Sequence, residues 1–413
     1  MTSRQQGRRS AVTGLGVVAP NGVGADAFWK ATRQGVSVLD RISREGCADL
    51  PLRVAGQVRD FDPQAVIDGR YLVQTDRFTH YAMAAADLAV ADAGFSPDPK
   101  DPFTVGVVTA AGSGGGEFGQ RELQQLWGQG PKFVGPYQSI AWFYAASTGQ
   151  ISIRGGYKGP CGVVASDEAG GLDALAHAAR AIERGTDAVV VGAAEAPLAP
   201  YSMVCQLGYP ELSLAEHPDR AYLPFSPAAN GFAPAEGGAM LLLEDEEAAR
   251  RRGATVRALL VGHGATFTGA SRWEDSREGL ANAIRIAMND ARIAAEEIDV
   301  VFADALGVPA ADRAEALALA DALGPYAERV PVTAPKTGTG RAYCGAPMLD
   351  TAAAVLAMED GVLPPTPNVT EVCHELALVT GHARPAELRT ALVLSRGLMG
   401  SNAALVLRRG RLD

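Results

Sequence analysis

The chain has 413 residues, of which 47% are hydrophobic, and its 37 basic and 47 acidic residues give a formal net charge of −10. This acidic balance excludes the basic stripe of a nucleic-acid-binding surface. No apolar run reaches the roughly 20 residues of a membrane-spanning helix, and the polar, basic N-terminus is not followed by the h-region of a signal peptide. We therefore expect a globular, cytoplasmic protein with a large core that binds neither nucleic acid nor a membrane.

Apolar runs in the first half of the chain predict strands buried on both faces, because the runs are continuous and do not alternate with polar residues. They lie at 11–18, 104–109, 162–166, 188–194 and 239–243. Between them, 76–93 and 171–183 carry apolar residues at helical spacing, and Gly185 follows the second stretch as a stop signal. This order predicts an α/β fold.

The second half repeats the same order of strands and helices. Its apolar runs lie at 256–266, 300–305, 330–333, 391–395 and 403–407, with helical spacing at 276–291 and 312–323. No low-complexity linker separates the two series. We therefore predict a duplicated fold with halves 1–250 and 251–413, which form one compact unit of stacked layers.

Metal and nucleotide sites are not predicted. The five cysteines are scattered without a C-x-x-C spacing, and the adjacent Cys373 and His374 would point apart in regular structure. The glycine-rich segment 12–20 lacks the third glycine and the acidic residue of a dinucleotide-binding loop. We expect no cofactor.

Residues 163–173 pass from an apolar strand into a helix through a tight turn, with Glu168 at its apex. Enzymes often hold a nucleophile at such a turn. The segment resembles the nucleophile elbow of β-ketoacyl-acyl carrier protein synthases, in which a Cys stands at the position of Glu168 and forms an acyl thioester. A carboxylate cannot perform that chemistry.

The resemblance covers nearly the whole chain and extends to the two catalytic histidines of these synthases. Residues 302–309 resemble the stretch that holds the first His, which places Asp304 at its position. Residues 336–341 resemble the Lys-Ser-x-x-Gly-His motif, which places Arg341 at the second His. The framework residues that carry over better are Glu195, Phe225, 231–238, Asp312, Glu315, Lys336 and 397–402.

Residues 169–176 resemble the elbow of one group within this family, the chain-length factor or ketosynthase β subunit of type II polyketide synthases. The resemblance implies a thiolase-like duplicated fold, layered αβαβα, and a catalytically incompetent subunit with vestigial positions Glu168, Asp304 and Arg341. It also implies a heterodimer with a ketosynthase α subunit, and substrates carried on acyl carrier protein phosphopantetheine. Arg121 and Lys158 are candidate contacts for the carrier protein. Glu168 departs from the group, which usually has Gln there.

The replacement residues predict a closed pocket. An anionic Asp304 would repel a developing enolate, and Arg341 stays protonated and cannot act as a base. We expect Glu168 to pair with Arg341, with Asp304 sharing the guanidinium; alternatively, Glu168 only caps the helix that follows it. The alternative function is a malonyl-acyl carrier protein decarboxylase that primes synthesis with Glu168 or Arg341.

Two segments, 110–123 and 137–153, resemble the parts of the family that line the polyketide tunnel at the subunit interface. The candidate tunnel and interface residues are Gly116, Phe118, Gly119, Leu123, Trp142, Phe143 and Tyr144. Because the two glycines have no side chain, we expect a roomier tunnel that favours a long or rigid chain such as a reduced polyene. The alternatives are a flexible loop at 112–116 and an ordinary core patch at 142–144.

Overall fold

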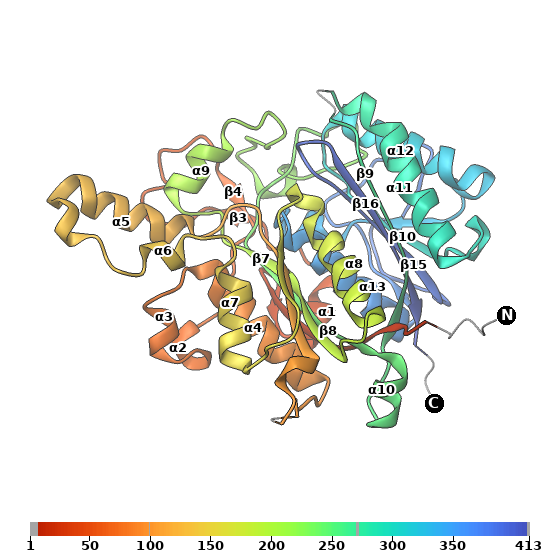
Figure 1. Ribbon diagram of the computed structural model, residues 1–413. Helices are drawn as coiled ribbons and strands as arrows, with labels where there is room; N and C mark the ends of the chain where they lie inside the picture. Colours follow the sequence, from red (N-terminus) through yellow and green to blue (C-terminus); the bar gives the residue numbers. More distant parts are fainter. Residues whose placement is uncertain (1–6, 99, 270–271, 411–413) are drawn as a thin grey trace.

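The computed structural model describes residues 7–98, 100–269 and 272–410. Most of its strands form a 12-stranded mixed sheet that runs through both halves of the chain (Figure 1). The first half contributes, in spatial order, β6 (Cys161–Val164), β5 (Val105–Ala110), β7 (Ala188–Glu195), β8 (Gly237–Asp245) and β1 (Ser10–Ala19). The second half contributes β9 (Ala258–Phe267), β16 (Ser401–Arg409), β15 (Thr390–Arg396), β10 (Val300–Phe302), β11 (Pro331–Thr333) and β13 (Ala377–Leu378). Beside these eleven strands, β2 (Gly22–Val23) pairs with β1 in the same sheet. Two small separate sheets are formed by β3 (Asp40–Arg41) with β4 (Val54–Ala55) and by β12 (Val362–Leu363) with β14 (Arg384–Pro385).

The two halves of the sheet join where β1 pairs with β9. The pairing is antiparallel and covers only Ser10, Ala11 and Val12 of β1. In both halves parallel and antiparallel neighbours are mixed, as in β5 with β7 and β7 with β8. The strands agree with the predicted apolar runs within a few residues, so the prediction of a repeated strand order is confirmed.

Helices cover the sheet in three layers. α4 (Arg77–Asp92) and α7 (Ala146–Gly155) pack on the outer face of the first half, and α11 (Ser276–Ala291) and α12 (Pro309–Leu323) pack on the outer face of the second. α8 (Gly170–Glu183) and α13 (Gly345–Asp360) lie between the two halves and meet strands of both. The predicted αβαβα layering is confirmed.

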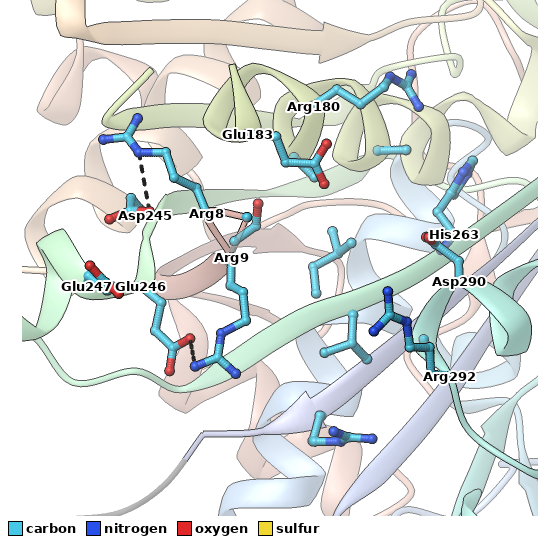
Figure 2. Close-up of a pocket in the computed structure, with 18 of the residues that line it drawn as sticks. Arg8, Arg9, Arg180, Glu183, Asp245, Glu246, Glu247, His263, Asp290 and Arg292 are labelled. Carbon is cyan, nitrogen blue, oxygen red and sulfur yellow. Dashed lines mark hydrogen bonds and ion pairs between the residues drawn. The ribbon is translucent and has the colours of Figure 1, made fainter. Parts of the chain in front are cut away.

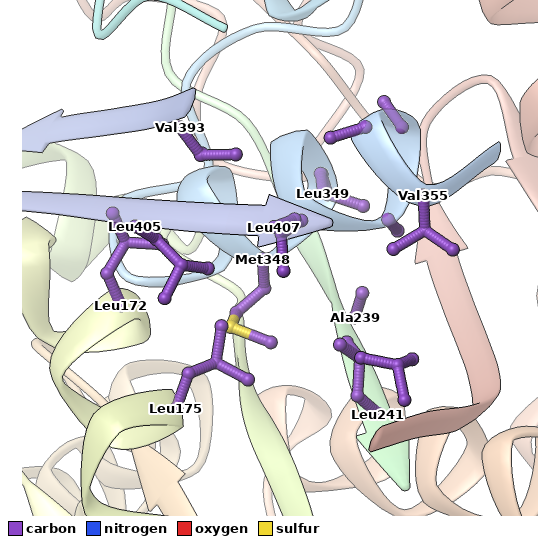
Figure 3. Close-up of a cluster of buried hydrophobic side chains, with 14 of the residues drawn as sticks. Leu172, Leu175, Ala239, Leu241, Met348, Leu349, Val355, Val393, Leu405 and Leu407 are labelled. Carbon is purple, nitrogen blue, oxygen red and sulfur yellow. The ribbon is translucent and has the colours of Figure 1, made fainter. Parts of the chain in front are cut away.

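The middle layer holds the main hydrophobic core. Figure 3 shows Leu172 and Leu175 of α8 facing Met348 of α13, with Leu405 and Leu241 from strands of opposite halves around them. α13 is buried on nearly all sides, as its sequence of Ala, Val, Leu and Met requires. This helix connects the two halves of the molecule at the level of the elbow.

The glycine-rich segment 12–20 is strand and not a turn. Gly14 and Gly16 lie inside β1, and a Cβ on Gly16 would stand 1.8 Å from the backbone oxygen of Ala85 in α4. The glycines therefore allow α4 to approach the sheet closely.

The remaining elements are short or lie at the edges. They are α1 (Ala25–Arg33), α2 (Pro63–Val66), α3 (Gly69–Leu72), α5 (Gly116–Gln129), α6 (Gln138–Ala141), α9 (Pro200–Gln206), α10 (Glu246–Arg251), β2 (Gly22–Val23), β3 (Asp40–Arg41), β4 (Val54–Ala55), β12 (Val362–Leu363) and β14 (Arg384–Pro385). α5 projects away from the body of the molecule (Figure 1). Among the described residues, no helix has the length and apolar character needed to traverse a membrane.

Candidate functional site

The elbow is a turn of 3-10 helix, Asp167–Ala169, between β6 and α8. The left-handed residue of this turn is Asp167, with φ of 57°, and its backbone oxygen accepts a bond from the Cys344 thiol at 3.0 Å. Glu168 follows it and is only 2% exposed. Glu168 is thus the middle residue of the turn, in agreement with the predicted apex, and its side chain is turned into the protein.

Glu168, Asp304 and Arg341 meet in the interior. Arg341 Nε donates to Glu168 Oε2 at 2.5 Å, and Arg341 Nη2 donates to Asp304 Oδ1 at 2.8 Å. The backbone oxygens of Asp304 and Arg396 accept the other two guanidinium bonds, at 3.1 and 2.7 Å. The predicted pairing of Glu168 with Arg341, and the sharing of the guanidinium by Asp304, are thus present.

A second arginine completes the cluster. Arg396, at the end of β15, is fully buried and donates from Nε to Asp304 Oδ2 at 3.0 Å and from Nη2 to Glu315 Oε2 at 2.9 Å. Glu315 in turn accepts the backbone N–H of Asp304 at 2.7 Å. Lys336 bonds the backbone oxygen of Asp304 at 3.1 Å and pairs with Asp350 at 2.5 Å. Asp304 is therefore surrounded by other charged side chains.

The two carboxylates on Arg341 have opposite electrostatic environments. Burial raises the pKa of Glu168 to about 7, although the charge of Arg341 lowers it. Burial would also raise the pKa of Asp304, but the charges of Arg341, Arg396 and Lys336 hold it at about 2. Three donated bonds reach the Asp304 carboxylate, whereas Glu168 Oε1 has no hydrogen-bond partner among the described residues.

Arg341 remains a cation in this setting. Burial alone would lower its pKa, but Asp304 and Glu168 raise it well above the ordinary value. It therefore cannot take or deliver a proton. The helix-cap alternative for Glu168 fails as well, since α8 begins after Ala169 without a side-chain cap and the Glu168 carboxylate is directed to Arg341.

The sequence analysis missed Asp167, Asp350 and Arg396. The sequence places Arg396 at the end of an apolar run and directly before the marked segment 397–402, but it does not show that this side chain reaches Asp304. Glu195, which the resemblance did mark, is fully buried and accepts the N–H of Gly112 at 2.6 Å. In the described part of the chain, no group of three or more His, Cys, Asp or Glu side chains is arranged to hold a metal ion.

The candidate tunnel and interface residues divide into exposed and buried ones. Trp142 is 50% exposed, and Leu123, Phe143 and Tyr144 are exposed as well, so the core-patch alternative for 142–144 is wrong. The rings of Phe143 and Tyr144 lie 4.6 Å apart. By contrast, Phe118 is buried beneath the Arg121 guanidinium, which lies 4.4 Å from its ring centre.

The two candidate glycines have different surroundings. A Cβ on Gly116 would stand 2.0 Å from Ser202 Oγ of α9, and a Cβ on Gly119 would be in ordinary contact with Trp142 at 3.7 Å. The flexible-loop alternative is also wrong at this end, because Gly116 begins α5. At Gly116 the Ser202 hydroxyl of α9 takes up the space next to the glycine, and the expectation of a roomier tunnel stays a prediction.

A separate cavity of about 1170 Å³ lies between the N-terminal segment, α8 and β9 (Figure 2). Its arginines are partly neutralised, since Arg9 pairs with Glu246 at 2.6 Å and Arg8 with Asp245 at 3.4 Å. Glu168, Asp304 and Arg341 do not line it. The buried cluster is therefore closed off from this cavity.

The sequence matches a known protein family over most of its length. Residues 8–249 match the β-ketoacyl synthase N-terminal domain and residues 257–370 match the C-terminal domain of that family. A Streptomyces coelicolor (strain ATCC BAA-471 / A3(2) / M145) protein named "Putative polyketide beta-ketoacyl synthase 2" is 72% identical over 404 residues, which cover 98% of this chain and 95% of that protein.

Two further relatives are more distant. The "Tetracenomycin polyketide synthase ketoacyl synthase beta subunit" of Streptomyces glaucescens is 51% identical over 96% of this chain and 98% of its own length. The solved structure named "The ishigamide ketosynthase/chain length factor" is 28% identical, with a TM-score of 0.87 over 98% of this chain and 99% of that chain.

Proposed function

The chain belongs to the β-ketoacyl synthase family and, within it, to the ketosynthase β or chain-length-factor group of type II polyketide synthases, and on that premise we propose that it is a non-elongating subunit. It pairs with a catalytic ketosynthase α subunit and shapes the tunnel that sets polyketide chain length. The observation that carries the proposal is the closed cluster in which Glu168 and Asp304 both bind Arg341.

Chain elongation requires groups that this cluster does not provide. A thiolate must hold the growing chain, and neutral donors or bases must stabilise the enolate that forms on decarboxylation. Here a carboxylate stands at the elbow, an anionic Asp304 stands beside it, and Arg341 is permanently protonated. The condensation therefore takes place on the partner subunit.

The exposed aromatic surface supports pairing with a partner. Trp142, Phe143 and Tyr144 are all more than a third exposed, in a segment that also leaves Tyr137 and Ile140 uncovered. A contiguous apolar surface of this kind is typical of a protein interface. Among the described residues, β6 is the last strand of the sheet and pairs with β5 alone, and such an edge strand is a candidate for pairing with a partner.

The related structures are consistent with this pairing. One is named as a ketosynthase/chain length factor, and another is named as a type II acyl-carrier protein in complex with its ketosynthase. For this chain we propose the same two partners, with substrates that arrive on the phosphopantetheine of the carrier protein and with no cofactor of its own.

Co-expression tests the proposal. The full chain is produced with a type II ketosynthase α subunit and its carrier protein, and complex formation and product length are measured by gel filtration and mass spectrometry. We expect a one-to-one complex, with product length that follows this chain when it is exchanged for a relative. A product length that depends only on the ketosynthase α subunit contradicts the proposal.

A second assay distinguishes the proposed non-elongating subunit from the alternative, a malonyl-acyl carrier protein decarboxylase. The purified chain is incubated with malonyl-acyl carrier protein, and acetyl-carrier protein is measured for the native chain and for Glu168→Gln. We expect no conversion above background with the native chain, because Arg341 is already bound by both carboxylates. Acetyl formation that disappears when Arg341 is replaced would establish the alternative.

A further inference from the structure

Asp167 ties the elbow to the loop that follows β15. Its Oδ2 accepts the backbone N–H of Met399 at 2.5 Å, and a Cβ on Gly397 would lie only 2.2 Å from the same oxygen. The carboxylate thus lies directly against the 397–400 loop. Met399 itself is 66% exposed, so this contact is at the protein surface, although the neighbouring Glu168 is buried.

The turn is held in a costly conformation. A non-glycine residue with φ of 57° is uncommon, although Asp tolerates it better than most residues do. Two contacts hold Asp167 there, from the Met399 N–H to its carboxylate and from the Cys344 thiol to its backbone oxygen. A conformation of this kind persists where the surroundings fix it and frequently marks a functional position.

The contact occupies a backbone N–H group close to the elbow. An acyl group that reacts at such a turn needs backbone N–H groups that are free to receive its oxygen. Here an internal carboxylate already accepts the N–H of Met399. Next to it, the hollow lined by Gly397, Leu398 and Gly400 has a volume of about 50 Å³, which is room for a few water molecules.

We propose that Asp167 is a specificity-determining residue that excludes acyl thioesters from this subunit's own elbow by latching the 397–400 loop over Glu168. The inference rests on the proposed function and explains how the non-elongating subunit keeps carrier-bound chains from entering a second, unproductive pocket. In this proposal the bond between the Asp167 carboxylate and Met399 N–H holds the loop closed, and Glu168 is already bound to Arg341.

A thiol placed at position 168 reports whether the entrance is open. The variants Glu168→Cys, Glu168→Cys/Asp167→Gly and Glu168→Cys/Asp167→Asn are prepared in the full chain. Gly suits the left-handed backbone and removes the acceptor, whereas Asn keeps an oxygen that can accept the Met399 N–H and removes only the charge. Asn is therefore the matched control.

The rate of alkylation by chloroacetyl-pantetheine is measured at residue 168 by peptide mass spectrometry. The exposed Cys161 and Cys205 of the same chain serve as internal references. We expect the Gly variant to react at least tenfold faster than Glu168→Cys, and the Asn variant to stay within about threefold of it. Equal rates with Asp167 and with Gly overturn the proposal, and so does an Asn variant as fast as the Gly variant.

A second measurement keeps the test decisive if the cysteine variants fold poorly. Asp167→Gly alone is compared with Asp167→Asn by hydrogen exchange of the 397–400 segment. Faster exchange in the Gly variant alone supports the latch, and unchanged exchange in both overturns it. Neither readout depends on product length, so the latch can fail while the co-expression experiment still decides the proposed function.

Discussion

Replacing Glu168 with Gln is expected to stabilise the protein above neutral pH and to leave its stability nearly unchanged near pH 5. Burial raises the pKa of this carboxyl to about 7 from its ordinary 4.5, despite the opposing charge of Arg341. The folded protein therefore keeps a proton that the unfolded chain loses. As a result, the free energy of unfolding falls as the pH rises from about 4.5 to about 7.

The size of the effect follows from the pKa difference. At about 1.4 kcal/mol per pKa unit, ionising Glu168 in the folded state costs about 3 kcal/mol by pH 8. Gln avoids this cost, but part of its amide would lie where Oε1 has no partner, and its bond to Arg341 is weaker than that of a carboxylate. We therefore expect a net gain of about 1 to 3 kcal/mol at pH 8.

Thermal unfolding of both proteins between pH 5 and pH 8.5 measures the effect. An unfolding entropy of about 2 cal/mol/K per residue over 413 residues converts the gain into a Tm increase of about 1 to 3 °C at pH 8. A Tm difference that does not change with pH would refute the reasoning. So would a Gln variant that is less stable than the native protein at pH 8.

Asp304→Asn is the contrasting control. Burial would raise the pKa of Asp304, but the charges of Arg341, Arg396 and Lys336 hold it at about 2. The ionised carboxylate therefore stabilises the fold above about pH 4, and this stability is lost only as the pH falls through about 2. The Asn variant should lose about 2 kcal/mol or more, equally at pH 5 and pH 8.

Three further changes test the packing and the surface. Gly116→Phe should destabilise the chain by about 1 to 3 kcal/mol in thermal unfolding, because its Cβ would meet Ser202. The control is Gly128→Ala in the same helix, whose Cβ meets no atom and which should stabilise the chain by up to about 1 kcal/mol. Arg396→Met should cost about 3 to 5 kcal/mol in urea unfolding, because it removes the cation paired with the buried Glu315 and one of the two cations paired with Asp304. Trp142→Ser should leave the Tm within about 1 °C and weaken the complex with the ketosynthase α subunit at least tenfold in a binding titration; a smaller effect removes Trp142 from the interface.

The strands and amphipathic helices could be predicted because their patterns are local. Continuous apolar runs marked the buried strands, and helical spacing marked α4, α8, α11 and α12. α13 escaped because it is apolar on nearly all sides, so it carries no periodic signal. The central helix α13 is therefore the helix that is hardest to predict from its sequence.

The site was predicted where a motif fixed the position and missed where only the tertiary fold does so. The resemblance brought Glu168, Asp304 and Arg341 together, and the charges of these residues then predicted their contacts. The function of Arg396 depends on the end of β15 reaching Asp304, which no local pattern shows. The packing of Gly116 against Ser202 was missed for a similar reason, since α9 is distant from α5 in sequence.

The three replaced positions depend on one another through their charges. Ion pairs link four carboxylates and three cations in this region, which leaves one formal negative charge; the members are Glu168, Asp304, Glu315, Asp350, Lys336, Arg341 and Arg396. Replacing Arg341 alone by a neutral His would leave two uncompensated negative charges in the interior, at a cost of several kcal/mol. Replacing all three positions by Cys, His and His removes two carboxylates together with one cation and leaves the remaining pairs balanced. Replacing Arg341 by His first is therefore unfavourable for folding. Glu168 or Asp304 must be replaced before Arg341.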